Sequence, residues 1–321
     1  MDTGSHLLFG ATLAGLAFLD PAVSGHPDLA HALLASTMIG SHAPDFDTVV
    51  RLKSYSHYIR YHRGITHSLP ALFIWPALIS LPIAALFGVM GSWSILYFWT
   101  LLAVIFHVFL DWLNAYGVQC FRPFDKRWRH LDVLPLFDPF LFGMHLVGVI
   151  VWLWRGWPPG PLFSAVYLLT FLYIGFRILV HRTVILRVKE QLKQAKAAIM
   201  LVPGLLWFKW QFILETDHEF RTGTISGQSI QLWDEYRKDR EHPAVRATLE
   251  AEGVKAFLHL AERVHVSITE KQDGFLVEWR EVRFWHNSKL PFGVDVRVDG
   301  NLRVRREQLY WSKKVWEPPY V

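Results

Sequence analysis

The sequence predicts an α-helical integral membrane domain followed by a small β-rich soluble domain. Apolar residues make up 52% of the 321 residues and the mean hydropathy is +0.21, which is high for a soluble protein. The 15 Trp and 23 Phe residues are typical of a chain that meets membrane interfaces. Beyond residue 200 the hydrophobic periodicity changes from helical to strand-like, so a second domain of different architecture is expected there.

Four segments are apolar over enough length to cross a bilayer of about 30 Å, the third of them only just. They cover residues 69–90, 93–113, 140–154 and 161–180. Two shorter apolar segments precede them, at 7–19 and 29–40, and are expected to form short helices buried among the others or partly inserted. The membrane domain therefore has four clear spans plus two short N-terminal helices.

The basic residues predict the orientation of these spans. Lys and Arg gather at 51–63, at 122–129 and at 182–193, whereas the two opposite turns hold only Arg155. Under the positive-inside rule the three basic regions are cytoplasmic. The chain is thus expected to be multi-pass, with its C-terminal domain in the cytoplasm.

Three regions follow from this reading: a membrane domain at 1–185, an amphipathic connecting helix at 186–200 and a β-rich domain at 201–321. In the last region Val294, Val296 and Val298 alternate with polar residues before an Asp299-Gly300 turn, which is typical of a β-hairpin. Asp273-Gly274 predicts a second hairpin between 263–270 and 275–284, and Trp207 to Thr216 is another expected strand.

The acidic residues of the first domain are all aspartates. Nine aspartates precede Glu190, the first glutamate of the chain. A solvated surface would carry both types, so either this half exposes little surface or several aspartates are ligands. The single cysteine, Cys120, excludes an internal disulfide and a thiolate-only metal site, so a metal would be held by His and carboxylates.

Four His and Asp clusters are expected at the cytoplasmic level of the membrane. His107 and Asp111 are four residues apart and so share one face of a helix, and His67 opens the antiparallel span. Singly, each cluster has a structural explanation: a hydrogen bond for the His-x-x-x-Asp pair, a helix cap for Asp2, a turn for the aspartates after Pro44. Together they predict one shared metal site with the ligands His6, Asp45, Asp47, His62, His67, His107 and Asp111. Asp138, which opens the third strong span, is a further candidate ligand or a partner of the ligands.

These residue types point to a divalent metal. Imidazole and carboxylate bind Zn²⁺, Mn²⁺ or Fe²⁺, of which Zn²⁺ is preferred here, and carboxylates can bridge two ions. One or two ions are therefore expected. Asp47 is assigned as a ligand or a general base, and Arg63 as the cation that orients a phosphate oxygen.

The motifs Pro44-Asp45-x-Asp47, His62-Arg63-Gly64-x-Thr66-His67-Ser68 and His107-x-x-x-Asp111, with Asp2 and His6 before them, resemble the YdjM-like bacterial membrane-bound metal-dependent hydrolases. The resemblance covers roughly residues 1–185. It implies a multi-span protein of the bacterial inner membrane, and it carries the ligand or catalytic roles onto the matching His and Asp residues.

Two functions are weighed. The first is a metal-dependent hydrolase at the cytoplasmic membrane interface that acts on a phosphoester of a phospholipid or another lipid-linked molecule. The second is a non-enzymatic metal-binding membrane sensor or regulator whose C-terminal domain is the output. The bilayer is the expected partner in both, a protein partner of the C-terminal domain is not identified, and no nucleic acid is expected. A transporter is disfavoured, because transporter sites lie toward the membrane midplane.

Overall fold

The structure, a computed structural model, describes residues 1–193, 196–238 and 241–311. It divides into two compact units. The helical unit comprises Met1–Thr48 and His62–Leu179, and the C-terminal unit comprises Val49–Tyr61 and the described residues from Val180 onward.

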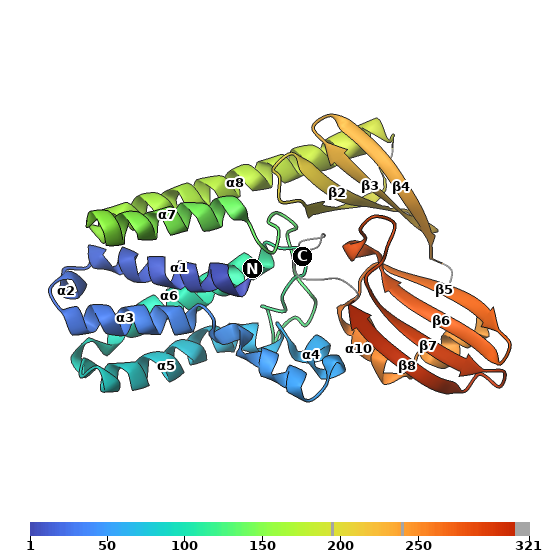
Figure 1. Cartoon of the computed structure of the whole chain (residues 1–321), viewed down its shortest axis with the longest axis horizontal. Helices are drawn as coiled ribbons and strands as arrows, with labels where there is room; N and C mark the ends of the chain where they lie inside the picture. Colours follow the sequence, from blue (N-terminus) through green and yellow to red (C-terminus); the bar gives the residue numbers. More distant parts are fainter. Residues whose placement is uncertain (194–195, 239–240, 312–321) are drawn as a thin grey trace. The chain divides into compact units, whose positions relative to one another are not determined.

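The helical unit is a bundle of apolar helices (Figure 1). Helix α1 packs against α3, α6 and α7, and α6 packs against α3 and α5. Two apolar clusters, one built around Phe9 and Phe163 and the other around Leu29 and Leu33, form its core. The elements that begin in this unit are α1 (Thr3–Leu16), η1 (Ala17–Leu19), α2 (Pro21–Ser24), α3 (Pro27–Gly40), η2 (Ala43–Leu52), η3 (Ile65–His67), α5 (Leu69–Leu86), η4 (Met90–Ser92), α6 (Trp93–Trp112), α7 (Pro139–Arg155) and α8 (Pro159–Gln191).

Three helices in the described part of the chain are long and apolar enough to cross a membrane: α5, the stretch Met90–Trp112 that contains α6, and α8. The third expected span, 140–154, corresponds to α7, which has 17 residues and is a shorter apolar helix. Thr3–Leu19 is likewise a shorter apolar helix. The helical membrane region followed by a sheet-containing domain is confirmed, but with three helices of spanning length rather than four.

Helix α8 runs without interruption through the fourth predicted span and into the first part, 186–191, of the expected connecting helix. It has 33 residues and ends at Gln191, and β1 begins at Ala198. Val184 and Val188 continue the helical spacing beyond the apolar run, and no proline separates the two segments. The expected boundary at 185/186 therefore lies inside one helix.

The C-terminal unit contains two four-stranded antiparallel sheets, each in the order of the chain. Val184 and Val188 of α8 pack against Trp210 and Phe212 of the first sheet. Its strands are β1 (Ala198–Pro203), β2 (Lys209–Glu215), β3 (Glu219–Ser226) and β4 (Ser229–Arg237), and those of the second sheet are β5 (Val264–Lys271), β6 (Gly274–Glu281), β7 (Phe292–Asp299) and β8 (Val304–Trp311).

Both predicted hairpins are present. Strands β5 and β6 pair across Lys271 and Gly274, and β7 pairs with β8, although the β7–β8 connection is longer than the two residues expected. Three helices were not predicted from the sequence: α4 (Tyr55–Tyr61), α9 (Pro243–Thr248) and α10 (Glu252–Leu260). α10 buries Val254, Phe257 and Leu260, a three-residue spacing that is helical in retrospect.

Close approach of α1 and α3 depends on Gly10. A Cβ atom at this position would lie 2.8 Å from the Thr37 carbonyl oxygen and 2.9 Å from Met38 Cα, both on α3. Backbone atoms cannot yield without moving the helix, so a side chain at residue 10 would push α3 away.

Gly10→Ala is therefore expected to lower the thermal unfolding midpoint of the detergent-solubilised protein, as measured by differential scanning fluorimetry. Gly143→Ala is the matched control, because an added Cβ there meets no atom within 4 Å. Equal midpoints for the two variants would contradict the close packing of α1 on α3.

Candidate metal centre

Helix α6 provides two of the candidate ligands. His107 and Asp111 lie one turn apart on the buried side of the helix, with relative exposures of 1% and 0%. The His107 Nε2 atom lies 3.5 Å from Asp111 Oδ2. The pair thus has the geometry expected from the i, i+4 spacing.

The tautomer of His107 is fixed by a backbone carbonyl. His107 Nδ1 lies 2.7 Å from the Ser41 carbonyl oxygen, which can only accept, so Nδ1 carries the hydrogen. In the neutral ring Nε2 then keeps its lone pair, and Nε2 is the atom that faces Asp111. A hydrogen bond of this kind is what normally orients a metal-binding histidine.

The loop that carries His62 and His67 is organised by Asp47. The two carboxylate oxygens of Asp47 accept hydrogen bonds from His62 Nδ1 at 2.7 Å, from the Arg63 amide at 3.0 Å and from the Thr66 hydroxyl. Arg63 has a φ of +59°, a conformation that costs energy for a residue with a side chain and is held here by these contacts. This turn delivers His67, at the end of η3, to the centre.

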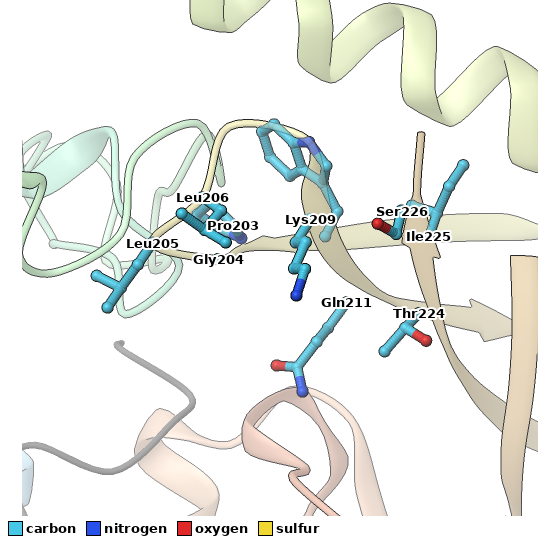
Figure 2. A pocket seen from close by; sticks show the side chains of 10 residues that line it. Pro203, Gly204, Leu205, Leu206, Lys209, Gln211, Thr224, Ile225 and Ser226 are labelled. Atoms are coloured by element: carbon cyan, nitrogen blue, oxygen red, sulfur yellow. The ribbon is translucent and has the colours of Figure 1, made fainter. Parts of the chain in front are cut away.

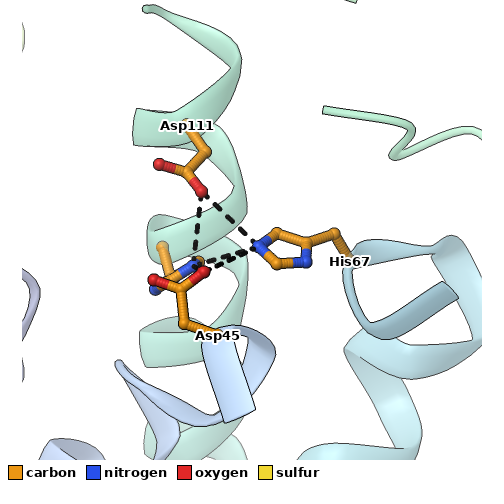
Figure 3. Close-up of side chains that lie close together, drawn as sticks. Asp45, His67 and Asp111 are labelled. Carbon is orange, nitrogen blue, oxygen red and sulfur yellow. Dashed lines mark hydrogen bonds and ion pairs between the residues drawn. The ribbon is translucent and has the colours of Figure 1, made fainter. Parts of the chain in front are cut away.

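Four side-chain atoms converge on one point. His67 Nε2 lies 3.3 Å from His107 Nε2, 3.4 Å from Asp45 Oδ1 and 3.5 Å from Asp111 Oδ2. His107 Nε2 lies 3.7 Å from Asp45 Oδ1. Figure 3 shows Asp45, His67 and Asp111 pointing toward one another from three separate elements.

These distances fit a tetrahedral metal site. With metal–nitrogen and metal–oxygen bonds of about 2.0–2.2 Å, ligand atoms in a tetrahedron are about 3.3–3.6 Å apart. In the described part of the chain, Asp45 Oδ1 and Asp111 Oδ2 are buried without a hydrogen-bond partner. Buried carboxylate oxygens rarely stay unsatisfied, so two such atoms facing two imidazole nitrogens indicate a cation-binding position. The clusters can therefore hold a metal ion.

A second group shares one of these ligands. Ligand atoms of Asp45, Asp47 and His62 also lie within 4.8 Å of one another, and Asp47 and His62 are buried. Asp45 thus belongs to both groups. A carboxylate in that position is suited to bridge two ions.

The two carboxyl groups of η2, those of Asp45 and Asp47, are held in the ionised form, which favours binding of a cation. Burial raises the pKa of Asp47, but the hydrogen bond and the charge of His62 more than offset it and leave this pKa below its ordinary value. Burial opposes ionisation of Asp45 as well, yet His107 and His67 hold the pKa of that carboxyl well below its usual range. Both groups are thus carboxylates at neutral pH.

Arg63 lies at the edge of the centre, and its guanidinium is directed at protein groups. Nη2 is 3.1 Å from Asp111 Oδ1, and Nη1 is 3.3 Å from Asn114 Oδ1. The side chain is 4% exposed and stacks over Tyr116. Asn114 was not identified from the sequence. Its position three residues after Asp111, just beyond the end of α6, could have indicated a contact between the two side chains.

The remaining candidates have other neighbours. His6 stacks on His107, with ring centroids 3.8 Å apart, and its Nε2 is 3.5 Å from Asp111 Oδ1, on the side away from the convergent Oδ2 atom. Asp2 caps α1 by accepting from the Ser5 amide, and Asp138 caps α7 and accepts from the Tyr173 hydroxyl. The ligand or catalytic roles assigned to all of these residues stay predictions: His6, Asp45, Asp47, His62, Arg63, His67, His107 and Asp111.

A family model described as YdjM inner membrane protein matches residues 1–184, and one described as YfhP C-terminal alpha/beta plait domain matches residues 243–317. The chain is 33% identical over 313 residues to an uncharacterized protein, YfhP of Bacillus subtilis (strain 168). The matched region covers 97% of this chain and 95% of that relative. No solved structure matches the chain. The first match covers the whole candidate centre.

Proposed function

The chain belongs to the YdjM inner membrane protein family, and from this premise we propose that it is a metal-dependent hydrolase at the cytoplasmic membrane interface. Its substrate is a phosphoester carried on a lipid. The single observation that carries the proposal is the convergence of Asp45, His67, His107 and Asp111 around two unpaired carboxylate oxygens.

The preferred ion is Zn²⁺, because two imidazoles and two carboxylates at tetrahedral separations suit it well. Mn²⁺ and Fe²⁺ are the alternatives, and the sharing of Asp45 supports a second ion beside Asp47 and His62. A bound divalent ion would supply Lewis-acid activation of the phosphoryl group and of water.

The protein's own residues divide the remaining work. The Asp47 carboxylate orients His62, whose imidazole lies 2.7 Å from it and is suited to hold a proton beside the ligands. Arg63 neutralises Asp111 inside the bundle. Of the four convergent side chains only Asp45 has solvent access, with 11% of its side chain exposed against 0% for the others, so a substrate oxygen would approach from the side of Asp45.

A lipid-carried substrate is supported by apolar side chains beside the ligands. Phe46 lies between Asp45 and Asp47 and is 44% exposed, and Ile65, two residues before His67, is 63% exposed. Exposed apolar groups next to a buried polar centre suit a substrate with an apolar part. The orientation with the centre and the C-terminal domain on the cytoplasmic side rests on the positive-inside pattern.

The burial of the four convergent side chains also favours the alternative function, a metal-binding sensor or regulator. Four protein ligands in a closed tetrahedron are typical of a structural zinc site, whereas a catalytic site keeps one position open. Metal content and phosphodiester hydrolysis, measured on the parent protein and on Asp45→Asn, distinguish the two. Loss of phosphodiester hydrolysis with the metal retained supports the enzyme, whereas metal retention in a parent protein that hydrolyses no phosphoester supports the regulator.

Elemental analysis of the detergent-purified protein is expected to find at least one equivalent of Zn, Mn or Fe. His67→Ala/His107→Ala should abolish it, because two of the four convergent atoms are removed. His26→Ala/His31→Ala is the matched control, since both of these histidines are exposed. Equal metal in all three proteins, or none in a folded parent supplied with each metal, would overturn the proposed centre.

A further inference from the structure

The connection between β1 and β2 exposes an unusual run of apolar residues. Leu206 is 49% exposed, Trp207 43% and Phe208 58%, and Leu205 before them is half-buried. We name residues 205–208 the apolar loop. Exposed apolar side chains in contiguous positions mark surfaces that contact a partner or a membrane.

The apolar loop is a formed structural element. The Gly204 amide donates to the Lys209 carbonyl at 3.1 Å, and the Lys209 amide donates to the Leu206 carbonyl at 3.0 Å. The Gly227 amide, from the β3–β4 turn, donates to the Phe208 carbonyl at 3.2 Å. The carbonyls of Leu206 and Phe208 are thus hydrogen-bonded, while the side chains of residues 206–208 are exposed.

Contacts within the C-terminal unit tie this loop to the point where α8 leaves its apolar stretch. His181 follows Leu179 by two residues, a rise of about 3 Å along a helix. The His181 ring lies 5.8 Å from that of Trp210, whose Nε1–H donates to the Trp207 carbonyl at 3.1 Å. The loop is therefore linked, through the side chains of His181 and Trp210, to the point where the apolar stretch of α8 ends.

Below the loop lies a cavity of about 550 Å³ with mostly apolar walls. Figure 2 shows Leu205 and Leu206 at one end of it, and Lys209 beside Gln211, with their polar ends directed into the space. An ammonium group next to an apolar insertion is the arrangement that pairs with a lipid phosphate.

We propose that the apolar loop inserts into the lipid–water interface of the leaflet from which α8 emerges. Leu206 and Phe208 enter the acyl boundary, Trp207 lies at the headgroup level and Lys209 pairs with anionic headgroups. The occupant of this surface is the bilayer that already holds α8. The C-terminal unit then has a second attachment to the membrane besides the helix.

The test uses the full chain in nanodiscs of phosphatidylcholine and phosphatidylglycerol. In a Cys120→Ser background, Leu206→Cys, Phe208→Cys and Gln272→Cys are labelled with an environment-sensitive fluorophore. Gln272 lies in the exposed β5–β6 turn of the same unit and is the matched control. The emission at 206 and 208 should be blue-shifted relative to that at 272, because the label enters an apolar environment. Lipids with a quencher high on the acyl chain should suppress the emission at 206 and 208 and leave that at 272 unchanged.

Equal emission at 206 and 272 with and without the quencher lipid would overturn the proposal. So would shielding of 206 from aqueous iodide without quenching by lipid, since the loop would then be covered by protein. Where labelling disturbs the fold, hydrogen exchange of the unlabelled chain decides. Slower exchange of residues 206–208 in nanodiscs containing the anionic lipid than in neutral ones supports insertion, and equal exchange contradicts it.

Discussion

Asp111→Asn is expected to lower the free energy of unfolding of the protein by about 3–5 kcal/mol, because it leaves a buried guanidinium without its carboxylate. Asp111 is fully buried, and its Oδ1 atom lies 3.1 Å from Arg63 Nη2. The amide fills the same space but carries no charge, so the loss reports the ion pairs of Asp111 with Arg63 and with the N-terminal ammonium of Met1 rather than a cavity. Denaturant unfolding in detergent measures this loss of stability. A chelator is present, so that a contribution from bound metal is excluded.

Arg63→Met placed on top of Asp111→Asn should recover part of the loss, since the guanidinium that lost its carboxylate is then removed as well. Asp125→Asn is the control for a general loss of charge. Asp125 pairs with Arg127 and Arg129 at a more exposed position, so its removal should change stability little. Additive effects of the Asp111 and Arg63 substitutions would contradict a coupled pair.

Removal of the metal is expected to give the second large effect. An ion that binds only the folded state stabilises it by about 4 kcal/mol at a free concentration about 1,000 times its Kd. The convergent atoms come from η2, η3 and α6, so one ion would cross-link three elements that are distant in sequence. Chelation should therefore lower the thermal unfolding midpoint, and Zn²⁺ added back should restore it.

The comparison variant is His67→Ala/His107→Ala, whose midpoint should not respond to chelator or to Zn²⁺. His26→Ala/His31→Ala should respond like the parent. A midpoint of the parent that ignores both chelator and added metal would show that no ion holds these elements together.

The sequence by itself determined the composition of the centre and part of its geometry. The four-residue spacing of His107 and Asp111 places both on one face of a helix whatever surrounds it, and that prediction is confirmed. The strand periodicity around Val294, Val296 and Val298 likewise predicted the β7–β8 hairpin, because alternation is a local property of the chain. The family assignment also followed from local motifs.

Only the tertiary structure decided how these residues are used. Which nitrogen of His107 faces the centre depends on the Ser41 carbonyl, 66 residues away, and the partner of Arg63 depends on how the turn at Gly64 meets α6. The sequence likewise did not show that Asp111 lies beside Arg63, whose assignment to a phosphate oxygen stays a prediction. Side-chain partners across helices depend on packing distances that no spacing along the chain encodes, so residue types were predictable and their contacts were not.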